Sequence, residues 1–309
     1  MTLQQPQPQP QPQQPQRQPV PPGSLRSWVA GARLKTLPVT LAPLAVGLAI
    51  AAEAGTVDRW HAVLTAVLVL GFVLGTNFFN DYSDGIRGVD DHRAGPARLV
   101  GSGQATPAQV FRHGLALFAV GALAGLVLAV LVSWWVLPLT VSLALGGWFY
   151  TGGPRPYGYR GFGEVSIFIY HGVVFVCAPV AIQLGHLPPA ALGASVPLGF
   201  LAVALLTTNN LRDIPTDAAA GKITLAVRMG AGPTRQFYVL CVAAAFVSAL
   251  LLASARPGAF LVLGAAPVAV LPVRRVLGGA AGRDLIPALE HTCLLLLAFG
   301  SLLAIGLAL

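Results

Sequence analysis

The sequence contains very few charged side chains. Asp, Glu, Lys and Arg make up only 10% of its 309 residues, whereas a soluble domain carries about 25%. Hydrophobic residues, in contrast, make up 55% of the chain. This composition argues against an ordinary soluble enzyme and predicts a protein that lies largely within a lipid bilayer.

Acidic residues are scarcer than basic ones, with 11 Asp and Glu against 19 Lys and Arg. In a soluble protein a net charge of +8 would suggest a nucleic-acid partner. Here the basic residues lie between long apolar runs, which is typical of loops that orient a membrane protein. We therefore expect no nucleic acid among its partners.

Cysteine is also rare. Cys177, Cys241 and Cys293 lie far apart, each inside an apolar run. This spacing excludes a cysteine metal site and predicts three small residues in the protein core.

Long apolar runs recur along most of the chain. A helix that crosses a bilayer needs about 20 mostly apolar residues. We expect an all-α integral membrane protein, a bundle of nine transmembrane helices formed by residues 24–309. The predicted spans are residues 37–54, 60–79, 113–132, 134–150, 165–185, 190–208, 237–254, 258–272 and 288–309.

The basic residues indicate how this bundle is oriented. With nine spans, all of the 19 Lys and Arg residues except Arg59 and Arg256 fall on one side of the membrane. The positive-inside rule places that side, the N-terminus and the long loops in the cytoplasm. We expect a multi-pass protein of the plasma membrane. Residues 1–23 are mostly Pro and Gln, so we expect them to form a disordered tail.

An acidic motif follows the second predicted span. If the helix continues beyond the span, Asn77, Asn80, Asp81 and Asp84 share one face, and Asp90 lies a short loop further on. Amide and carboxylate oxygens are the ligands that magnesium prefers. This motif therefore predicts a magnesium site at the membrane surface.

A second motif, on the same side, follows the sixth span. Asn210, Asp213 and Asp217 repeat the spacing of Asn77, Asn80 and Asp84. A divalent cation would relieve the repulsion among carboxylates gathered at a membrane boundary. Positively charged residues of the same segments can offset the charge of a diphosphate, and these residues are Arg87, Arg212, Lys222 and Arg228.

Two other interpretations of the motifs remain open. They could be ordinary polar caps at helix ends, although two motifs with matched spacing on one side of the membrane argue against that. They could also form the ion site of a cation-coupled transporter. A transporter favours acidic residues near the middle of the bilayer, whereas these lie at the ends of spans.

The chain resembles the UbiA superfamily of intramembrane prenyltransferases from about Arg33 to its end. Within that superfamily it looks most like the branch that prenylates 1,4-dihydroxy-2-naphthoate. One sign is the six-residue step from Asp84 to Asp90, which is typically four residues in the 4-hydroxybenzoate branch. The matching strings are residues 32–38, 80–90, 95–100, 150–157, 161–164, 209–217 and 221–228.

The resemblance implies a reaction and a set of site residues. A polyprenyl diphosphate would ionise with the help of Mg²⁺, and the naphthoate ring would attack the allylic cation and lose carbon dioxide. Acceptors such as 4-hydroxybenzoate remain an alternative. Metal ligands would be Asn80, Asp84, Asp213 and Asp217, assisted by Asp81 and Asp90. The catalytic residues would be Asp84, Asp213, Asp217 and Lys222.

Further residues are expected to bind the substrates. Those expected to contact the diphosphate are Arg87, Arg155, Lys222, Arg228, Asn209 and Asn210. Arg33 and Lys35 could meet the carboxylate of the aromatic acid. Tyr150 and Tyr157 could contact diphosphate or stabilise the cation through their rings, or they could simply be tyrosines at the membrane interface.

Overall fold

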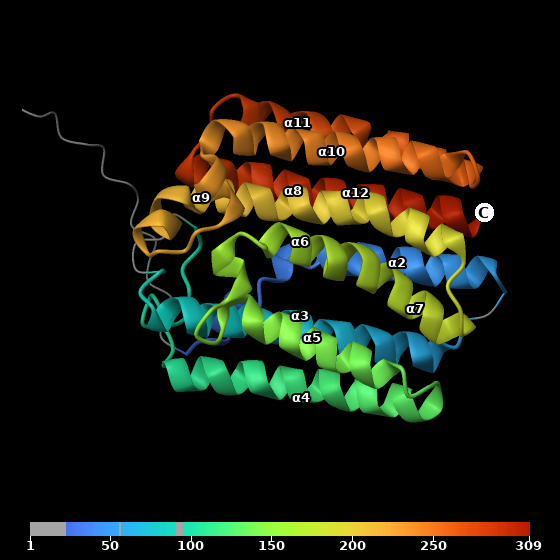
Figure 1. Cartoon of the computed structure of the whole chain (residues 1–309), viewed down its shortest axis with the longest axis horizontal. Coiled ribbons are helices and arrows are strands. Elements are labelled where there is room, and N and C mark those ends of the chain that lie inside the picture. The colour runs from blue at the N-terminus through green and yellow to red at the C-terminus, as the bar shows by residue number, and fades with distance from the viewer. Residues whose placement is uncertain (1–22, 56, 91–94) are drawn as a thin grey trace, which may run out of the picture.

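The structure is a computed structural model that describes residues 23–55, 57–90 and 95–309. Most of the predicted disordered tail, residues 1–22, and Asp91 lie outside these ranges. Every regular element of the described residues is helical, which confirms the all-α prediction. The long helices run side by side along the long axis of the molecule (Figure 1).

Within the described residues, the N-terminal half consists of two short helices followed by five long helical segments. Its elements are α1 (Leu25–Gly31), η1 (Leu34–Thr36), α2 (Pro38–Glu53), α3 (Arg59–Ile86), α4 (Pro107–Leu131), α5 (Val136–Thr151), η2 (Tyr157–Arg160), α6 (Gly163–Ile167), the π-helical η3 (Phe168–Val174) and α7 (Phe175–Leu184). The last of the long segments combines α6, η3 and α7.

The C-terminal half has the same character. Its elements are α8 (Pro189–Ala219), α9 (Leu225–Met229), α10 (Ala231–Ala253), η4 (Pro257–Ala265), α11 (Ala266–Leu277), η5 (Gly282–Leu285) and α12 (Ile286–Ala308).

Each of the nine predicted spans falls on one of these helical segments, but not all of the segments have the length of a span. Among the described residues, seven are long and apolar enough to cross a membrane. An eighth is reached if residues 25–36 and α2, which meet at a bend of 52°, count as one span. The ninth, α5, has only 16 residues.

The outer surface of the bundle is apolar, as contact with lipid requires. Leu123 on α4, Leu251 on α10 and Leu271 on α11 each expose more than half of their surface. Inside, small residues bring helices close together. A Cβ atom on Gly71 of α3 would lie 2.8 Å from the Cα of Gly121 on α4, so only glycine allows these backbones to approach so closely.

Two helices carry the acidic motifs beyond their apolar runs. α3 continues to Ile86 and α8 continues through Pro215 to Ala219, so both motifs lie on helical turns. The segments that follow α3, α5 and α8 gather at one end of the bundle, and the C-terminus lies at the other (Figure 1). The fold thus brings the two motifs to one end.

Candidate functional site

The first acidic motif occupies the last turns of α3, where Asn80, Asp81 and Asp84 are all buried. The hydroxyl of Thr151, at the end of α5, donates a hydrogen bond of 2.7 Å to Asn80 Oδ1. The hydroxyl of Tyr159 donates one of 2.5 Å to Asp84 Oδ1. Neutral donors from the end of α5 and from η2 therefore orient both side chains.

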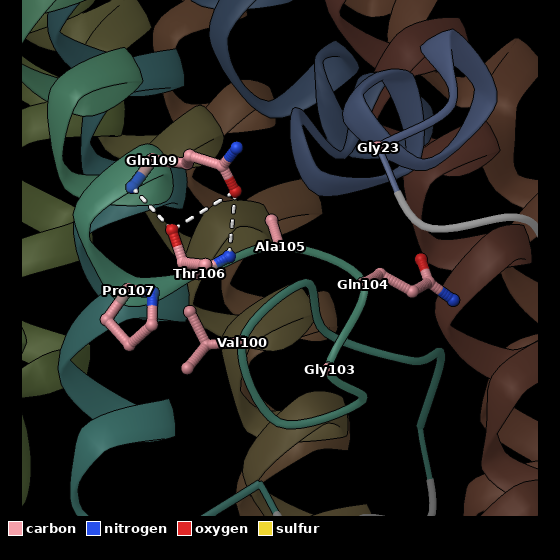
Figure 2. A pocket seen from close by; sticks show the side chains of 8 residues that line it. All are labelled: Gly23, Val100, Gly103, Gln104, Ala105, Thr106, Pro107 and Gln109. Atoms are coloured by element: carbon pink, nitrogen blue, oxygen red, sulfur yellow. Dashed lines mark hydrogen bonds between the residues drawn. The ribbon is translucent and has the colours of Figure 1, made fainter.

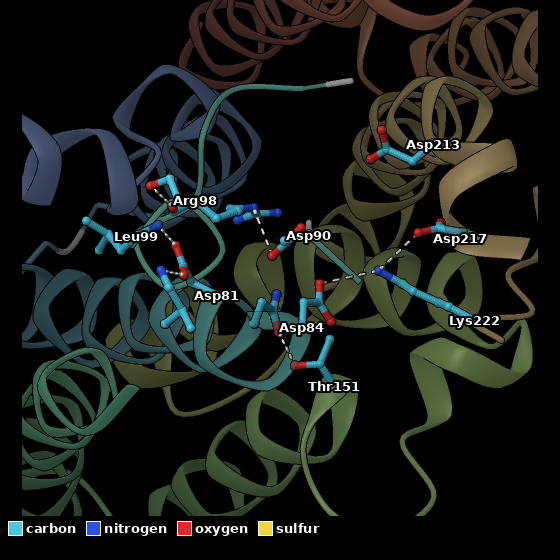
Figure 3. Close-up of polar contacts among 12 residues, drawn as sticks. Asp81, Asp84, Asp90, Arg98, Leu99, Thr151, Asp213, Asp217 and Lys222 are labelled. Atoms are coloured by element: carbon cyan, nitrogen blue, oxygen red, sulfur yellow. Dashed lines mark hydrogen bonds and ion pairs between the residues drawn. The ribbon is translucent and has the colours of Figure 1, made fainter. Parts of the chain in front are cut away.

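Asp81 has different neighbours. Its two carboxylate oxygens accept hydrogen bonds from the backbone amides of Leu99 and Val100, each at 2.9 Å (Figure 3). Asn77, one turn earlier, donates to Ala32 O at 3.1 Å. The four polar residues of this motif therefore divide into two pairs, of which Asn80 and Asp84 bond the end of α5 and η2.

Asp90 follows α3 and is also buried. Its Oδ2 atom lies 3.8 Å from Arg98 Nε (Figure 3). This separation is that of an ion pair, so a cation from the loop before α4 already balances part of the Asp90 charge.

The second motif lies on the last turns of α8, where Asn210, Asp213 and Asp217 are buried. Arg212 donates two hydrogen bonds of 2.7 Å to the carboxylate of its neighbour Asp213. Asn210 Nδ2 donates a 2.8 Å bond to Glu164 Oε1 on α6. The Arg212 guanidinium thus fixes Asp213, and the Glu164 carboxylate of α6 fixes Asn210.

Lys222 joins the two motifs. Its ammonium lies 3.5 Å from Asp84 Oδ2 and 3.7 Å from Asp217 Oδ1 (Figure 3). Since the two carboxylates belong to helices far apart in the sequence, the fold has brought both motifs to within reach of a single cation. Lys222 is itself mostly buried.

The donor set at this place fits magnesium. Within the described residues, no three His, Cys, Asp or Glu side chains form a compact metal cluster. Magnesium usually takes only one or two carboxylates and completes its shell with water and substrate phosphates. Asp84 and Asp217 are buried and face one ammonium. Their hard oxygens could bind a metal ion, whose charge would help to balance the two carboxylates.

The remaining predicted basic residues are spread around this site. Arg87 donates to the carbonyl oxygens of Thr151 at 2.6 Å and of Gly153 at 2.7 Å, so it holds the chain after α5. Arg228 donates to Arg160 O at 3.1 Å, and Arg155 is exposed.

The residues predicted to meet the aromatic acid lie near the start of α2. Lys35 forms an exposed ion pair of 2.9 Å with Glu290 on α12. Arg33 adopts left-handed backbone angles, with φ 55°, at the turn before η1.

The predicted tyrosines pack against each other. The rings of Tyr150 and Tyr157 meet edge to face, with centroids 5.5 Å apart. The Tyr157 hydroxyl donates to Gly146 O at 2.6 Å and lies 2.9 Å from Ser166 Oγ, while burial raises its pKa to about 12. Asn209, predicted to bind diphosphate, is half-buried on α8.

Sequence reasoning missed Thr151 and Tyr159. Both lie in or beside the string that carries the two predicted tyrosines, but their partners on α3 are 71 and 75 residues away. Burial, and next the Asp84 charge, raise the pKa of the Tyr159 hydroxyl, so it remains a proton donor. No local pattern distinguishes Tyr159 from Tyr157, which has other partners.

A separate hollow of about 510 Å³ lies at the start of α4. It is lined by residues around the Thr106–Gln109 cap of that helix, together with Gly23 and Val100 (Figure 2). None of the motif carboxylates lines it, so it is distinct from the site at Lys222.

Comparison with known proteins adds to this geometry. Residues 40–284 match the model of the UbiA prenyltransferase family. The chain belongs to this family. A UbiA homolog from Archaeoglobus fulgidus, whose structure was solved bound to GPP and Mg²⁺, has the same fold. The TM-score is 0.65 at 15% identity, covering 90% of this chain and 99% of that one.

Two mycobacterial members of the UbiA family are much more similar in sequence. Both are named 1,4-dihydroxy-2-naphthoate octaprenyltransferase. The protein from Mycobacterium tuberculosis is 44% identical, with 92% of this chain and 98% of that protein aligned. The protein from Mycobacterium leprae is 42% identical, with 87% and 92% aligned.

Proposed function

We propose that this chain transfers a polyprenyl group from a polyprenyl diphosphate to 1,4-dihydroxy-2-naphthoate, with Mg²⁺ as its cofactor. The names of its mycobacterial relatives support this acceptor. The observation that carries the proposal is the meeting of Asp84, Asp217 and Lys222 at one point. Such a point offers oxygens for a metal and an ammonium for a diphosphate.

The reaction forms one carbon–carbon bond and breaks two bonds. The prenyl carbon leaves the diphosphate oxygen and bonds to the ring carbon that bears the carboxylate. The carboxylate then departs as carbon dioxide, and its bonding electrons return to the ring. The products are diphosphate, carbon dioxide and demethylmenaquinol, a precursor of menaquinone.

Residues of both motifs would hold Mg²⁺. They are Asn80, Asp84, Asp213 and Asp217, with Asp90 beside them. When bound, the metal would stabilise the negative charge that develops on the leaving diphosphate. Asp81 is also a predicted ligand, but its bonds to the Leu99 and Val100 amides favour a role in holding that loop.

The positively charged side chains would bind the rest of the diphosphate. Lys222 lies between the two motifs. Its ammonium is therefore the first candidate to stabilise the negative charge that develops on the leaving diphosphate. Arg228 and Arg155, together with Asn209 and Asn210, would bind the outer oxygens. Arg87 would act chiefly through the carbonyl oxygens that it already contacts.

The helices would bind the apolar tail and exclude water from the allylic cation. The ring of Tyr150 would face that cation, while Tyr157 supports Tyr150 from its edge. Arg33 and Lys35 would attract the carboxylate of the acceptor from the aqueous side. These assignments place the donor within the bundle and the acceptor at its end.

The proposal also includes the membrane topology. The chain would cross the plasma membrane nine times, with its N-terminus and both motifs on the cytoplasmic side. The basic residues concentrated on one side support this orientation. The short α5 would also cross the bilayer and bring the count to nine. Magnesium and the aromatic acid would reach the motifs from the cytoplasm.

The test is an assay of the purified protein in lipid nanodiscs with Mg²⁺, geranylgeranyl diphosphate and one acceptor at a time. We expect prenylated, decarboxylated product from 1,4-dihydroxy-2-naphthoate, together with released diphosphate, and none when Mg²⁺ is chelated. Product from 4-hydroxybenzoate alone would overturn the acceptor assignment. Cation transport by reconstituted protein without diphosphate release would overturn the proposed reaction.

A further inference from the structure

Tyr159 contacts the first acidic motif and also the segment that follows the second one. It lies on η2, between α5 and α6, and its hydroxyl donates to Asp84 Oδ1 of the first motif at 2.5 Å. Its carbonyl oxygen accepts a 3.0 Å hydrogen bond from the amide of Ile223, which follows the second motif. One residue thus links α3 to the segment that carries Lys222.

The ring of Tyr159 also faces two cations. Lys222 Nζ lies 5.3 Å from its centroid, and Arg87 Cζ lies 5.4 Å from it. Both distances fall within the range of a cation–π interaction. Because the same ammonium faces Asp84 and Asp217, the ring helps to set the position of the cation that joins the motifs.

The Tyr159 hydroxyl is chemically suited to orient a carboxylate that binds a metal. A phenol donates a hydrogen bond without carrying a positive charge, so it orients Asp84 but leaves the carboxylate negative. Oδ1 is bound by Tyr159 and Oδ2 faces Lys222. Hydrogen bonds that orient ligating carboxylates in this way contribute substantially to metal affinity.

A purely structural role would be to anchor the segment after α5. That anchor exists without the Tyr159 hydroxyl, since Arg87 binds the carbonyl oxygens of Thr151 and Gly153. Thr151 itself donates to Asn80. The hydroxyl of Tyr159 is therefore available for orienting Asp84 rather than needed for holding the loop.

We propose that Tyr159 is a positioning residue, whose hydroxyl orients the Asp84 carboxylate and whose ring places the Lys222 ammonium for a magnesium-bound prenyl diphosphate. This inference rests on the proposed function in taking that substrate as the ligand. It assigns a role to a residue that touches neither the metal nor the diphosphate directly.

The test compares Tyr159→Phe with Tyr238→Phe. The control removes the hydroxyl of a more deeply buried tyrosine, whose hydrogen-bond partner is Thr292 of α12 rather than a residue of either motif. Isothermal titration with geranyl diphosphate, at fixed Mg²⁺ and without acceptor, measures binding. We expect Tyr159→Phe to weaken binding about tenfold or more, as loss of a bond to a ligating carboxylate does, and Tyr238→Phe to leave it unchanged.

Kinetics give a second readout. For Tyr159→Phe we expect the Mg²⁺ concentration at half-maximal rate to rise about tenfold, while KM for the aromatic acceptor stays within twofold of wild type. Equal Mg²⁺ requirements in Tyr159→Phe and wild type would overturn the inference. A wild-type protein that binds geranyl diphosphate but prenylates no acceptor would overturn the proposed function and leave the binding comparison valid.

A double-mutant comparison protects the test against misfolding. If the hydroxyl acts through Asp84, then Tyr159→Phe should weaken binding in the wild-type background but not in an Asp84→Asn background. Equal losses in both backgrounds would assign Tyr159 a general structural role and contradict the proposal. Thermal unfolding of each variant shows whether its fold is intact.

Discussion

The two acidic motifs have similar spacing but opposite kinds of partners. In the first, Asn80 and Asp84 accept hydrogen bonds from the neutral hydroxyls of Thr151 and Tyr159. In the second, the Asp213 carboxylate is bound on both oxygens by the guanidinium of Arg212. The hydrogen bonds that orient Asn80 and Asp84 therefore come from neutral groups, and the nearest cation to Asp84 is Lys222 at 3.5 Å, whereas Asp213 is bound directly by a guanidinium.

This difference suggests a division of labour. A carboxylate that is oriented by a neutral hydroxyl and lies 3.5 Å from an ammonium, as Asp84 does, can bind a metal cation without first breaking a short bond to a guanidinium. A carboxylate paired with a guanidinium gains less from a metal, because it must first give up part of that bond. We infer that the first motif sets the affinity for Mg²⁺ and that the second responds mainly when the diphosphate is present.

The largest expected effect comes from Asp84. We expect Asp84→Asn to lower kcat on the order of 10³-fold, the loss typical when a main electrostatic contact to the transition state is removed. It should also weaken Mg²⁺ binding in the absence of diphosphate. Initial rates and titration of the purified variant check both effects.

Asp213→Asn provides the comparison. It should reduce kcat strongly but change Mg²⁺ binding without diphosphate much less than Asp84→Asn does. If both variants weakened that binding equally, the division between the motifs would be wrong. Unchanged activity in either folded variant would count against a metal at the motifs.

The success of the sequence in placing these motifs has a physical reason. A bilayer requires long apolar helices whatever their neighbours, so apolar runs located the helical segments well. The shared face of the first motif required the helix to continue past residue 79, and α3 does continue, to Ile86. Its continuation places Asn80 and Asp84 one turn apart on the same side.

The partners of the polar side chains were less predictable. Asp81 is separated from Asp84 by only three positions, yet it bonds a different loop. Arg212 looked like a diphosphate ligand, but it binds its neighbour Asp213. Such pairings depend on how distant segments pack, and a single sequence does not contain that information locally.

The next largest effect is expected for Lys222, which faces both motifs. We expect Lys222→Met to lower kcat/KM about 10²-fold, since a positive charge near the leaving group is lost. It should also increase the repulsion between Asp84 and Asp217 in the metal-free protein. A lower unfolding temperature without Mg²⁺, recovered when Mg²⁺ is added, is the expected accompanying result.

Steady-state kinetics and thermal unfolding measure the two consequences separately. A suitable control is Arg256→Met, which removes a partly exposed cation paired with Glu53 and should change the unfolding temperature only slightly. Normal kcat/KM in Lys222→Met would show that the motifs work without the cation that joins them in this structure.

The smallest effect on catalysis is expected for Asp81. An amide offers only one acceptor oxygen, so Asp81→Asn loses one of the bonds to Leu99 and Val100 and should cost about 1–3 kcal/mol of stability. The Mg²⁺ requirement should stay within twofold of wild type. A large rise in the Mg²⁺ requirement would indicate that Asp81 is a metal ligand after all.

The most direct test of the two-motif site is a structure of the protein in nanodiscs with Mn²⁺ and an unreactive geranyl thiodiphosphate. Mn²⁺ takes the same hard oxygen ligands as Mg²⁺ and is easier to locate. We expect metal bound by oxygens of Asp84 and Asp217, with the Lys222 ammonium on the diphosphate. Diphosphate held by basic residues alone, with no metal at either motif, would contradict it.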